Sequence, residues 1–160
     1  MIRIIPYEAA HKAAVIDLVI SIQRGEFGIA ITAEEQPDLM DIPGFCQKGS
    51  GNFWVALSDD DVVGTIALLD IGEGRGALRK MFVEKNHRGR ETGVALRLLE
   101  TLLAWARDKG LREILLGTTA AYHAAHRFYE KHGFTELPPE QLPVSFPRIR
   151  QDSRFYRMVL

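Results

Sequence analysis

The chain has 160 residues, of which 46% are hydrophobic and 26% charged, and its formal net charge is −1. This length suits a single domain over residues 1–160, and the near-neutral charge without a lysine or arginine block argues against a nucleic-acid partner. The one cysteine, Cys46, excludes an intrachain disulfide and fits a cytoplasmic protein, while the absence of a signal peptide and of a roughly 20-residue apolar run argues against a membrane partner.

The first half of the chain alternates short β-branched runs with stretches of helical periodicity. Apolar residues at Val15, Leu18 and Ile22 follow a helical spacing, and a polar turn at Asp59–Asp61 separates two apolar runs. The expected elements, in chain order, are a strand over Ile2–Ile5, a helix over His11–Arg24, a short helix within Asp38–Lys48, and an antiparallel hairpin of strands Asn52–Ser58 and Val62–Ile71.

The second half carries the clearest helix, because Ala95, Leu98 and Leu102 share one face and Gly110 stands at the expected stop. The proline-rich segment Leu137–Pro147 predicts an extended loop. The other expected elements are strand Ala77–Val83, helix Glu91–Lys109, strand Glu113–Leu116, helix Ala120–His132 and a closing strand Phe155–Leu160. This order predicts an α/β or α+β fold with a mixed sheet.

The junction between strand Ala77–Val83 and the long helix predicts an anion site. Backbone N–H groups at a helix start lack intrahelical partners, and the helix dipole adds roughly +0.5 charge there. Gly89 and Gly93 allow a close backbone approach, and Arg88 and Arg90 add bidentate donors. These features alone indicate a phosphate-like anion, and an ordinary glycine-containing loop also fits them.

Two motifs resemble those of the GCN5-related N-acetyltransferase (GNAT) family. Arg88–Ala95 reads Arg-Gly-Arg-Glu-Thr-Gly-Val-Ala and is similar to the family's pyrophosphate loop, Gln/Arg-x-x-Gly-x-Gly/Ala, which precedes a long amphipathic helix. Ala124–Phe134, which ends Phe-Tyr-Glu-Lys-His-Gly-Phe, is similar to the family's later helix. The two motifs in this order and at this spacing indicate the family more specifically than either motif alone. Glu91 replaces a family glycine, so its carboxylate would have to point away from the pyrophosphate.

The resemblance implies a mixed, mostly antiparallel twisted sheet with a splayed central strand pair flanked by helices. It also implies transfer of an acetyl group from acetyl-CoA to a primary amine by direct attack on the thioester, with no metal. Backbone groups of the splayed strand would hold the pantetheine arm, and Tyr122 stands where the family often has an asparagine. The implied cofactor-binding residues are Met81, Phe82, Val83, Arg88, Gly89, Arg90, Glu91, Thr92, Gly93, Val94, Tyr122, Ala125 and Phe128.

Tyr129 matches the family tyrosine that protonates the departing thiolate. A phenol pKa of about 10 and a thiol pKa of about 8.5 make this transfer reasonable at neutral pH. The same position also fits a core tyrosine. A lysine-like amine with a pKa of about 10.4 needs a base. The candidates are Glu84 at the strand exit and Glu26 in the segment expected to cover the acceptor, with Glu34 or Glu35 acting through a water chain.

The acceptor is expected to be a small-molecule amine or a protein amine, and two charge clusters favour different chemistries. The first cluster favours a cationic amine and consists of the carboxylates Glu34, Glu35, Asp38 and Asp41. The second favours an acceptor that bears a carboxylate and consists of the arginines Arg148, Arg150, Arg154 and Arg157.

Four further points stay open or are set aside. A non-catalytic acyl-CoA sensor on the same fold is the alternative function. An ATP or NAD protein is disfavoured, because Gly-x-x-x-x-Gly-Lys-Ser/Thr and Gly-x-Gly-x-x-Gly are both missing. His123 and His126 have a metal-compatible spacing without an evident third ligand, so no metal site is expected. The closing strand offers a route to a homodimer.

Overall fold

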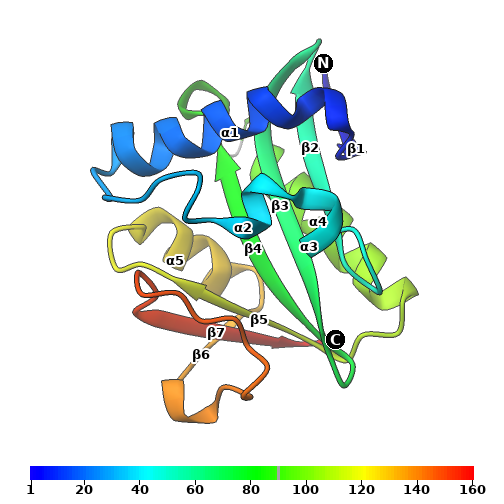
Figure 1. Ribbon diagram of the computed structural model, residues 1–160. Helices are drawn as coiled ribbons and strands as arrows, with labels where there is room; N and C mark the ends of the chain where they lie inside the picture. The colour runs from blue at the N-terminus through cyan, green and yellow to red at the C-terminus, as the bar shows by residue number, and fades with distance from the viewer. Residues whose placement is uncertain (90) are drawn as a thin grey trace.

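The computed structural model describes residues 1–89 and 91–160 and shows one sheet with helices on both faces (Figure 1). The strand order is β1-β2-β3-β4-β5-β7-β6, and every neighbouring pair is antiparallel except the parallel pair β4–β5. This confirms the expected mixed, mostly antiparallel sheet. The strands are β1 Ile2–Pro6, β2 Asn52–Ser58, β3 Asp61–Gly72, β4 Arg75–Val83, β5 Glu113–Thr118, β6 Thr135–Leu137 and β7 Arg154–Val159.

The helices form two layers, with α1, α2 and α3 on one face of the sheet and α4 and α5 on the other (Figure 1). Their bounds are α1 Lys12–Ile20, which continues as a π-helix over Ser21–Glu26, α2 Pro37–Met40, α3 Ile42–Phe45, α4 Val94–Asp108 and α5 His123–Lys131, with 3-10 turns at Ala9–His11, Lys85–His87 and Pro139–Gln141. Leu98 and Leu102 of α4 share a buried cluster with Ile66, whereas Val15 and Val19 of α1 belong to a second cluster. In the part of the chain described, no helix has the length and apolar character needed to cross a membrane.

Two helix starts differ from the prediction. The long helix begins at Val94 rather than Glu91, because Gly93 has a left-handed backbone with φ +61° and cannot be part of a right-handed helix. Glu91 therefore lies in the loop and not in the first helical turn. The later helix begins at His123 rather than Ala120.

The segment after the later helix contains a strand that the sequence did not predict. β6 pairs with the edge of β7 through only three residues, of which Leu137 alone is buried. A three-residue strand is too short to show the two-residue alternation by which strands are recognised. The rest of Leu137–Pro147 is irregular apart from one 3-10 turn, as expected.

A bulge in β4 changes which side chains share a face of the sheet. Thr65 of β3 pairs with Phe82, whereas Ala67 pairs with Arg79, so β4 carries one extra residue at this point. Lys80 adopts φ +53°, and its carbonyl accepts a 2.7 Å hydrogen bond from the Thr65 hydroxyl. A non-glycine residue in this backbone region costs about 1–3 kcal/mol. The bulge shifts the alternation along β4 by one position beyond Arg79.

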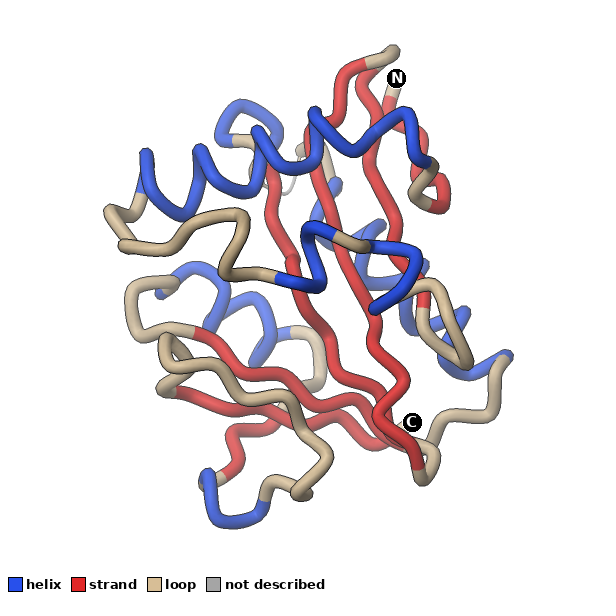
Figure 2. Tube along the Cα trace, in the orientation of Figure 1, coloured by secondary structure: helices blue, strands red, loops and turns tan. Residues whose placement is uncertain are grey.

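Strands β4 and β5 stay together for only three residue pairs. The pairs are Arg75–Glu113, Gly76–Ile114 and Ala77–Leu115. Beyond Ala77, β4 continues alongside β3 while β5 continues alongside β7, and the strands diverge (Figure 2). This confirms the expected splayed central pair.

The entry of the chain into β2 provides a stability test. A Cβ added at Gly51 would lie 2.6 Å from the Leu68 carbonyl oxygen and would also overlap the Cys46 carbonyl oxygen. Both obstacles are backbone atoms, so Gly51→Ala is expected to lower the free energy of unfolding by about 1–3 kcal/mol or more in urea denaturation. Gly25→Ala, where nothing lies within 4 Å, is the matched control and should be near neutral. Equal effects of the two substitutions would contradict this packing.

Candidate active site

A cavity of about 460 Å³ opens where β4 parts from β5. Four segments line it: the end of β4, the loop before α4, the start and inner face of α5, and the turn that follows the π-helix. Nine predicted site residues are among the lining residues, namely Met81, Phe82, Val83, Arg88, Gly89, Tyr122, Ala125, Phe128 and Tyr129. Two motifs separated by about forty residues therefore meet at one cavity.

The remaining predicted residues of the loop lie outside this cavity. Arg90 falls outside the described residues. The Thr92 hydroxyl donates to the His87 carbonyl at 2.6 Å and Val94 is buried in the core, while Glu91 and Gly93 do not line the cavity. Their contact with a pyrophosphate stays a prediction.

The first helical segment also contributes to the cavity, although no motif in the sequence indicates it. Ile22 and Phe27 come from this segment and line the cavity. The Phe27 ring packs edge-on against Tyr122 with centroids 4.8 Å apart. Neither residue belongs to a motif, and Ile22 was predicted only as part of an apolar helix face. Their placement depends on how α1 crosses the sheet.

The loop geometry supports an anion site at the start of α4. Gly89 and Gly93 have φ values of +105° and +61°, which side chains at these positions would strain. The turn brings the backbone around the N-terminus of a 15-residue helix. The first-turn N–H groups and the helix dipole point there, and both favour a negative charge.

Arg88 is already engaged by a carboxylate. Both terminal nitrogens of its guanidinium contact the Glu26 carboxylate, and its Nε donates to the Val83 carbonyl at 2.8 Å. The hydrogen bond from Arg88 holds the pKa of Glu26 below its usual value. Glu26 is therefore a weak proton acceptor, and it occupies the donors that Arg88 would offer to a phosphate.

Tyr129 lies at the inner end of the cavity. Its hydroxyl makes no hydrogen bond within residues 1–89 and 91–160, although the residue is only 5% exposed. Burial raises the pKa of Tyr129 well above its usual value, so the phenol stays protonated at neutral pH. Tyr129 therefore lines the cavity as a protonated phenol that can donate a proton to a bound group.

Tyr122 is a second phenol on the same cavity. Burial, with a smaller effect from Glu26, raises the pKa of Tyr122 to about 12. Its ring lies between Phe27 and Phe82. It therefore also holds its proton at neutral pH and has to be distinguished from Tyr129 by experiment.

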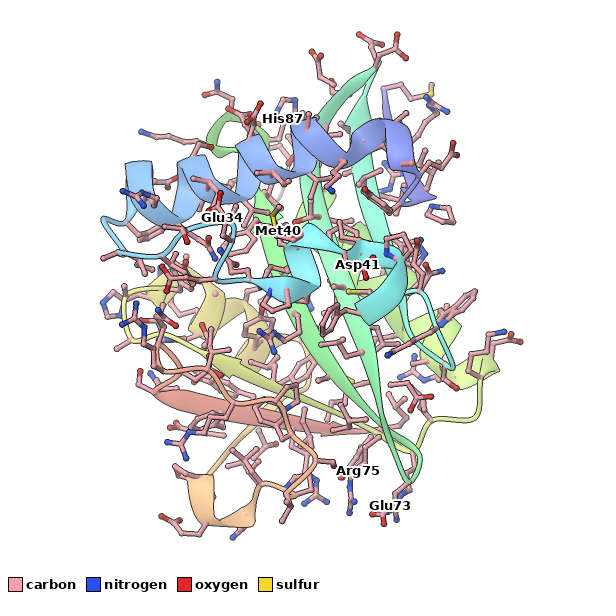
Figure 3. All side chains as sticks on the ribbon, viewed as in Figure 1. Glu34, Met40, Asp41, Glu73, Arg75 and His87 are labelled. Atoms are coloured by element: carbon pink, nitrogen blue, oxygen red, sulfur yellow. The ribbon has the colours of Figure 1, made fainter. Side chains whose placement is uncertain are left out.

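Glu84 is committed to the turn after β4. Its carboxylate lies 2.6 Å from His87 Nδ1 and accepts the Asn86 N–H at 3.2 Å. The hydrogen bond with His87 lowers the pKa of Glu84, which weakens it as a base. Figure 3 places His87 beyond the end of β4, and neither residue lines the cavity.

The histidines of α5 have local partners. His126 Nε2 lies 2.9 Å from the Thr119 carbonyl, and its Nδ1 lies 3.2 Å from Arg154 Nη1, so both ring nitrogens are used. Burial lowers the pKa of His126. Over the described ranges, no three His, Cys, Asp or Glu residues are grouped to hold a metal ion.

A sheet opened between two strands, a glycine turn at a helix start and a buried phenol therefore meet at one cavity. Residues 16–134 match the model of the acetyltransferase (GNAT) family. The chain belongs to this family.

Similar proteins agree with this assignment. A GNAT acetyltransferase structure from Staphylococcus aureus has a TM-score of 0.96 and 35% identity and covers 99% of both chains. N-acetylaspartate synthetase of Xenopus tropicalis is 39% identical over 102 residues, which is 62% of this chain and 37% of that protein. The chain thus spans less than half the length of the curated relatives it matches. N-acetylglutamate synthase of Neisseria gonorrhoeae, solved with coenzyme A and N-acetyl-glutamate, shares the fold with a TM-score of 0.76, at 15% identity over 100% of this chain and 35% of that one.

The contact between Glu26 and Arg88 predicts an effect on cofactor affinity. Glu26→Gln removes a negative charge beside the expected phosphates and frees the Arg88 guanidinium to bind a phosphate. The Kd for acetyl-CoA, measured by calorimetry at low salt, should therefore fall about 3- to 10-fold. Glu100→Gln, on the exposed face of α4, makes the same charge change away from the cavity and should leave the Kd unchanged. A weaker affinity for Glu26→Gln would show that the carboxylate positions Arg88 for binding.

Proposed function

We propose that this chain is an acetyl-CoA-dependent N-acetyltransferase that acetylates a primary amine by direct attack on the thioester. The observation that carries the proposal is the cavity between the diverging strands, which runs from the Arg88–Gly89 loop to Tyr129. Its lining is mostly apolar at the centre and cationic at the loop, which suits the pantetheine arm and the phosphates of one ligand.

The edge of β4 supports the placement of the arm. Beyond Ala77 this edge has no strand partner among the described residues, so backbone groups over Met81–Val83 are available to a ligand, except the Val83 carbonyl, which accepts from Arg88. A pantetheine arm contains two amides and can pair with such an edge as an added strand does. One N–H group directed at the thioester carbonyl would act as an oxyanion donor.

The position of Cys46 favours direct attack over an acyl-cysteine intermediate. Cys46 is fully buried beneath α3 in the cluster on the α1 side of the sheet, away from the cavity. Burial raises the pKa of its thiol to about 12, so the nucleophilic thiolate is scarce at neutral pH. The amine nitrogen then attacks the carbonyl carbon, the C–S bond breaks, and the thiolate takes a proton from Tyr129.

Removal of the Tyr129 hydroxyl tests the proton donor. Tyr129→Phe is expected to lower kcat about 100-fold while leaving the Kd for acetyl-CoA nearly unchanged, because a general acid acts mainly in the transition state. Thiol release in a broad amine screen and calorimetry with acetyl-CoA measure the two quantities.

Tyr156→Phe is the matched control. It removes the hydroxyl of another buried tyrosine, which donates to Glu130 and lines no cavity. Tyr122→Phe shows whether the second phenol supplies the proton instead. A protein that binds acetyl-CoA but releases no thiol with any amine would be a sensor, and a Tyr129→Phe protein with full kcat would remove Tyr129 from the mechanism.

A further inference from the structure

Two smaller cavities, of about 90 and 280 Å³, continue from the end of the acetyl-CoA cavity. The first shares Met81, Phe82, Tyr122 and Tyr129 with that cavity. The second shares Arg79, Lys80 and three further residues with the first, namely Ile31, Ile149 and Gln151, and lies beside α2. Under the proposed function, on which this inference rests, this path is the place for the acceptor amine.

Two consecutive cations face this path because of the bulge in β4. Without the extra residue, Arg79 and Lys80 would point to opposite faces of the sheet. With it, both contact the same Asp38 oxygen, Lys80 at 3.0 Å and Arg79 at 3.4 Å. The strained Lys80 backbone and its bond to Thr65 therefore place two positive charges at one point.

These cations outnumber their buried counter-ion. The side chains of Lys80, Arg79 and Asp38 are 4%, 12% and 8% exposed, so two basic side chains share one buried carboxylate. Burial lowers the pKa of Lys80, and the nearby Asp38 carboxylate opposes this change. Apart from Asp38, Arg79 donates to the Pro147 carbonyl at 3.0 Å. Within the described residues Lys80 has one hydrogen-bond partner for three N–H donors. An anionic guest would accept hydrogen bonds from these unused donors and would favour the charged form of Lys80.

The charges expected to select the acceptor are otherwise neutralised. Glu35 pairs with Arg150 at 3.3 Å at the rim of the larger acceptor cavity. Asp41 accepts the Gly44 N–H and caps α3, and Figure 3 shows it and the exposed Glu34 on the side of the sheet that carries α2 and α3. The acidic cluster thus offers no free patch for a cationic amine.

The remaining arginines of the tail are engaged elsewhere. Arg154 pairs with Glu136 at 2.8 Å, Arg157 pairs with Glu113 at 3.2 Å, and Arg148 lies over the Phe155 ring. None of the three lines either acceptor cavity. Of the tail arginines, Arg150 alone lines an acceptor cavity, and it is paired with Glu35.

Asp152 lies at the other end of the path. It lines the smaller acceptor cavity with Tyr129, and one of its oxygens accepts the Ile149 N–H at 3.1 Å. The same oxygen lies against Gly117 of β5, where a Cβ would stand 2.7 Å from it. Asp152 forms no salt bridge with Arg79 or Lys80 within the described ranges. Its carboxylate is therefore not consumed by the cation group.

We propose that the acceptor is a primary amine that also carries a carboxylate, an amino acid in its simplest form, with its ammonium group at Asp152 and its carboxylate at Arg79 and Lys80. The order of the cavities supports this orientation. Arg79 and Lys80 line both acceptor cavities, whereas Asp152 lines only the one that also contains Tyr129.

Asp152 also supplies the base that neither Glu26 nor Glu84 provides. The Asp152 carboxylate takes one proton from the ammonium group, and the neutral nitrogen attacks the thioester carbon. The C–S bond then breaks, the thiolate receives the Tyr129 proton, and the second proton of the attacking nitrogen returns to the Tyr129 phenolate, so one amide, one thiol and one protonated Asp152 result. Burial raises the pKa of Asp152 above its usual value, against the pull of Arg79, Lys80 and Arg148, and makes it a stronger proton acceptor.

A panel of acceptors tests the carboxylate requirement. Thiol release and product mass spectrometry compare free L-amino acids, their α-amides, a peptide with a free N-terminus and an amidated C-terminus, and 1,4-diaminobutane. Because a charge-assisted hydrogen bond is lost in the amides, kcat/KM for the best amino acid should exceed that of its amide about 10- to 100-fold. Preference for an amide, the peptide or the diamine would overturn this proposal and leave the proposed function standing. Thiol release with no amine, despite acetyl-CoA binding, would instead overturn the proposed function.

Substitution of Lys80 tests the carboxylate end of the path. Lys80→Met should raise KM for the amino acid about 10-fold and leave KM for its amide unchanged, since Arg79 and Asp38 then form a neutral pair. Lys80→Arg keeps the charge and should keep the preference. Lys109→Met, which removes a cation lying over Trp105 on the surface, is the matched control. Unchanged selectivity in a folded Lys80→Met protein, judged by acetyl-CoA binding, would contradict the assignment.

Substitution of Asp152 tests the amine end. Asp152→Asn should lower kcat about 100-fold or more with an amino acid. Aminooxyacetate, which carries a carboxylate and an amine already neutral at neutral pH, should react with the variant and the unaltered protein at similar rates. Asp70→Asn alters an aspartate that also accepts backbone N–H groups but lines no acceptor cavity, and should leave kcat unchanged. Loss of rate with aminooxyacetate as well would show that Asp152 is structural.

Discussion

The parting of β4 from β5 after Ala77 is the constraint on which the rest of the molecule depends. Each strand can leave the other because each has another neighbour: β3 holds β4 as far as Val83, and β7 holds β5 as far as Thr118. The opening exposes one edge of β4 to a ligand, and α5 closes it with Tyr129. Without this opening the loop at Arg88 would face an intact sheet.

The bulge at Lys80 gives the two sides of the opening different chemistry. The acetyl-CoA side is lined by aromatic and aliphatic groups, whereas the other side collects Arg79, Lys80, Asp38 and Asp152. Both the strained backbone and the buried charges disfavour folding, and the large apolar clusters on the two faces of the sheet offset this cost. A strained backbone conformation at Lys80, beside these cavities, is typical of a binding or catalytic site.

The charged residues show that clusters of charge along the sequence do not by themselves locate a binding site. The acidic run and the arginine-rich tail stand out in the sequence, yet most of their members form ion pairs or caps. Arg79 and Lys80 stand in an unremarkable strand, and their surplus charge follows from burial beside a single carboxylate. Glu26 likewise meets Arg88 across 62 positions of sequence.

The sequence by itself determined the family, the order of the elements and most lining residues of the cavity between β4 and β5, because glycine turns, helical periodicity and the two motifs are local properties. It placed the start of α4 three residues early, since the left-handed Gly93 that interrupts the helix cannot be read from composition. Only the tertiary structure decided that Glu26 engages Arg88 and that Arg79, Lys80 and Asp152 surround the acceptor path. These contacts join distant segments, and their register depends on a one-residue bulge that leaves no periodic signal in the chain.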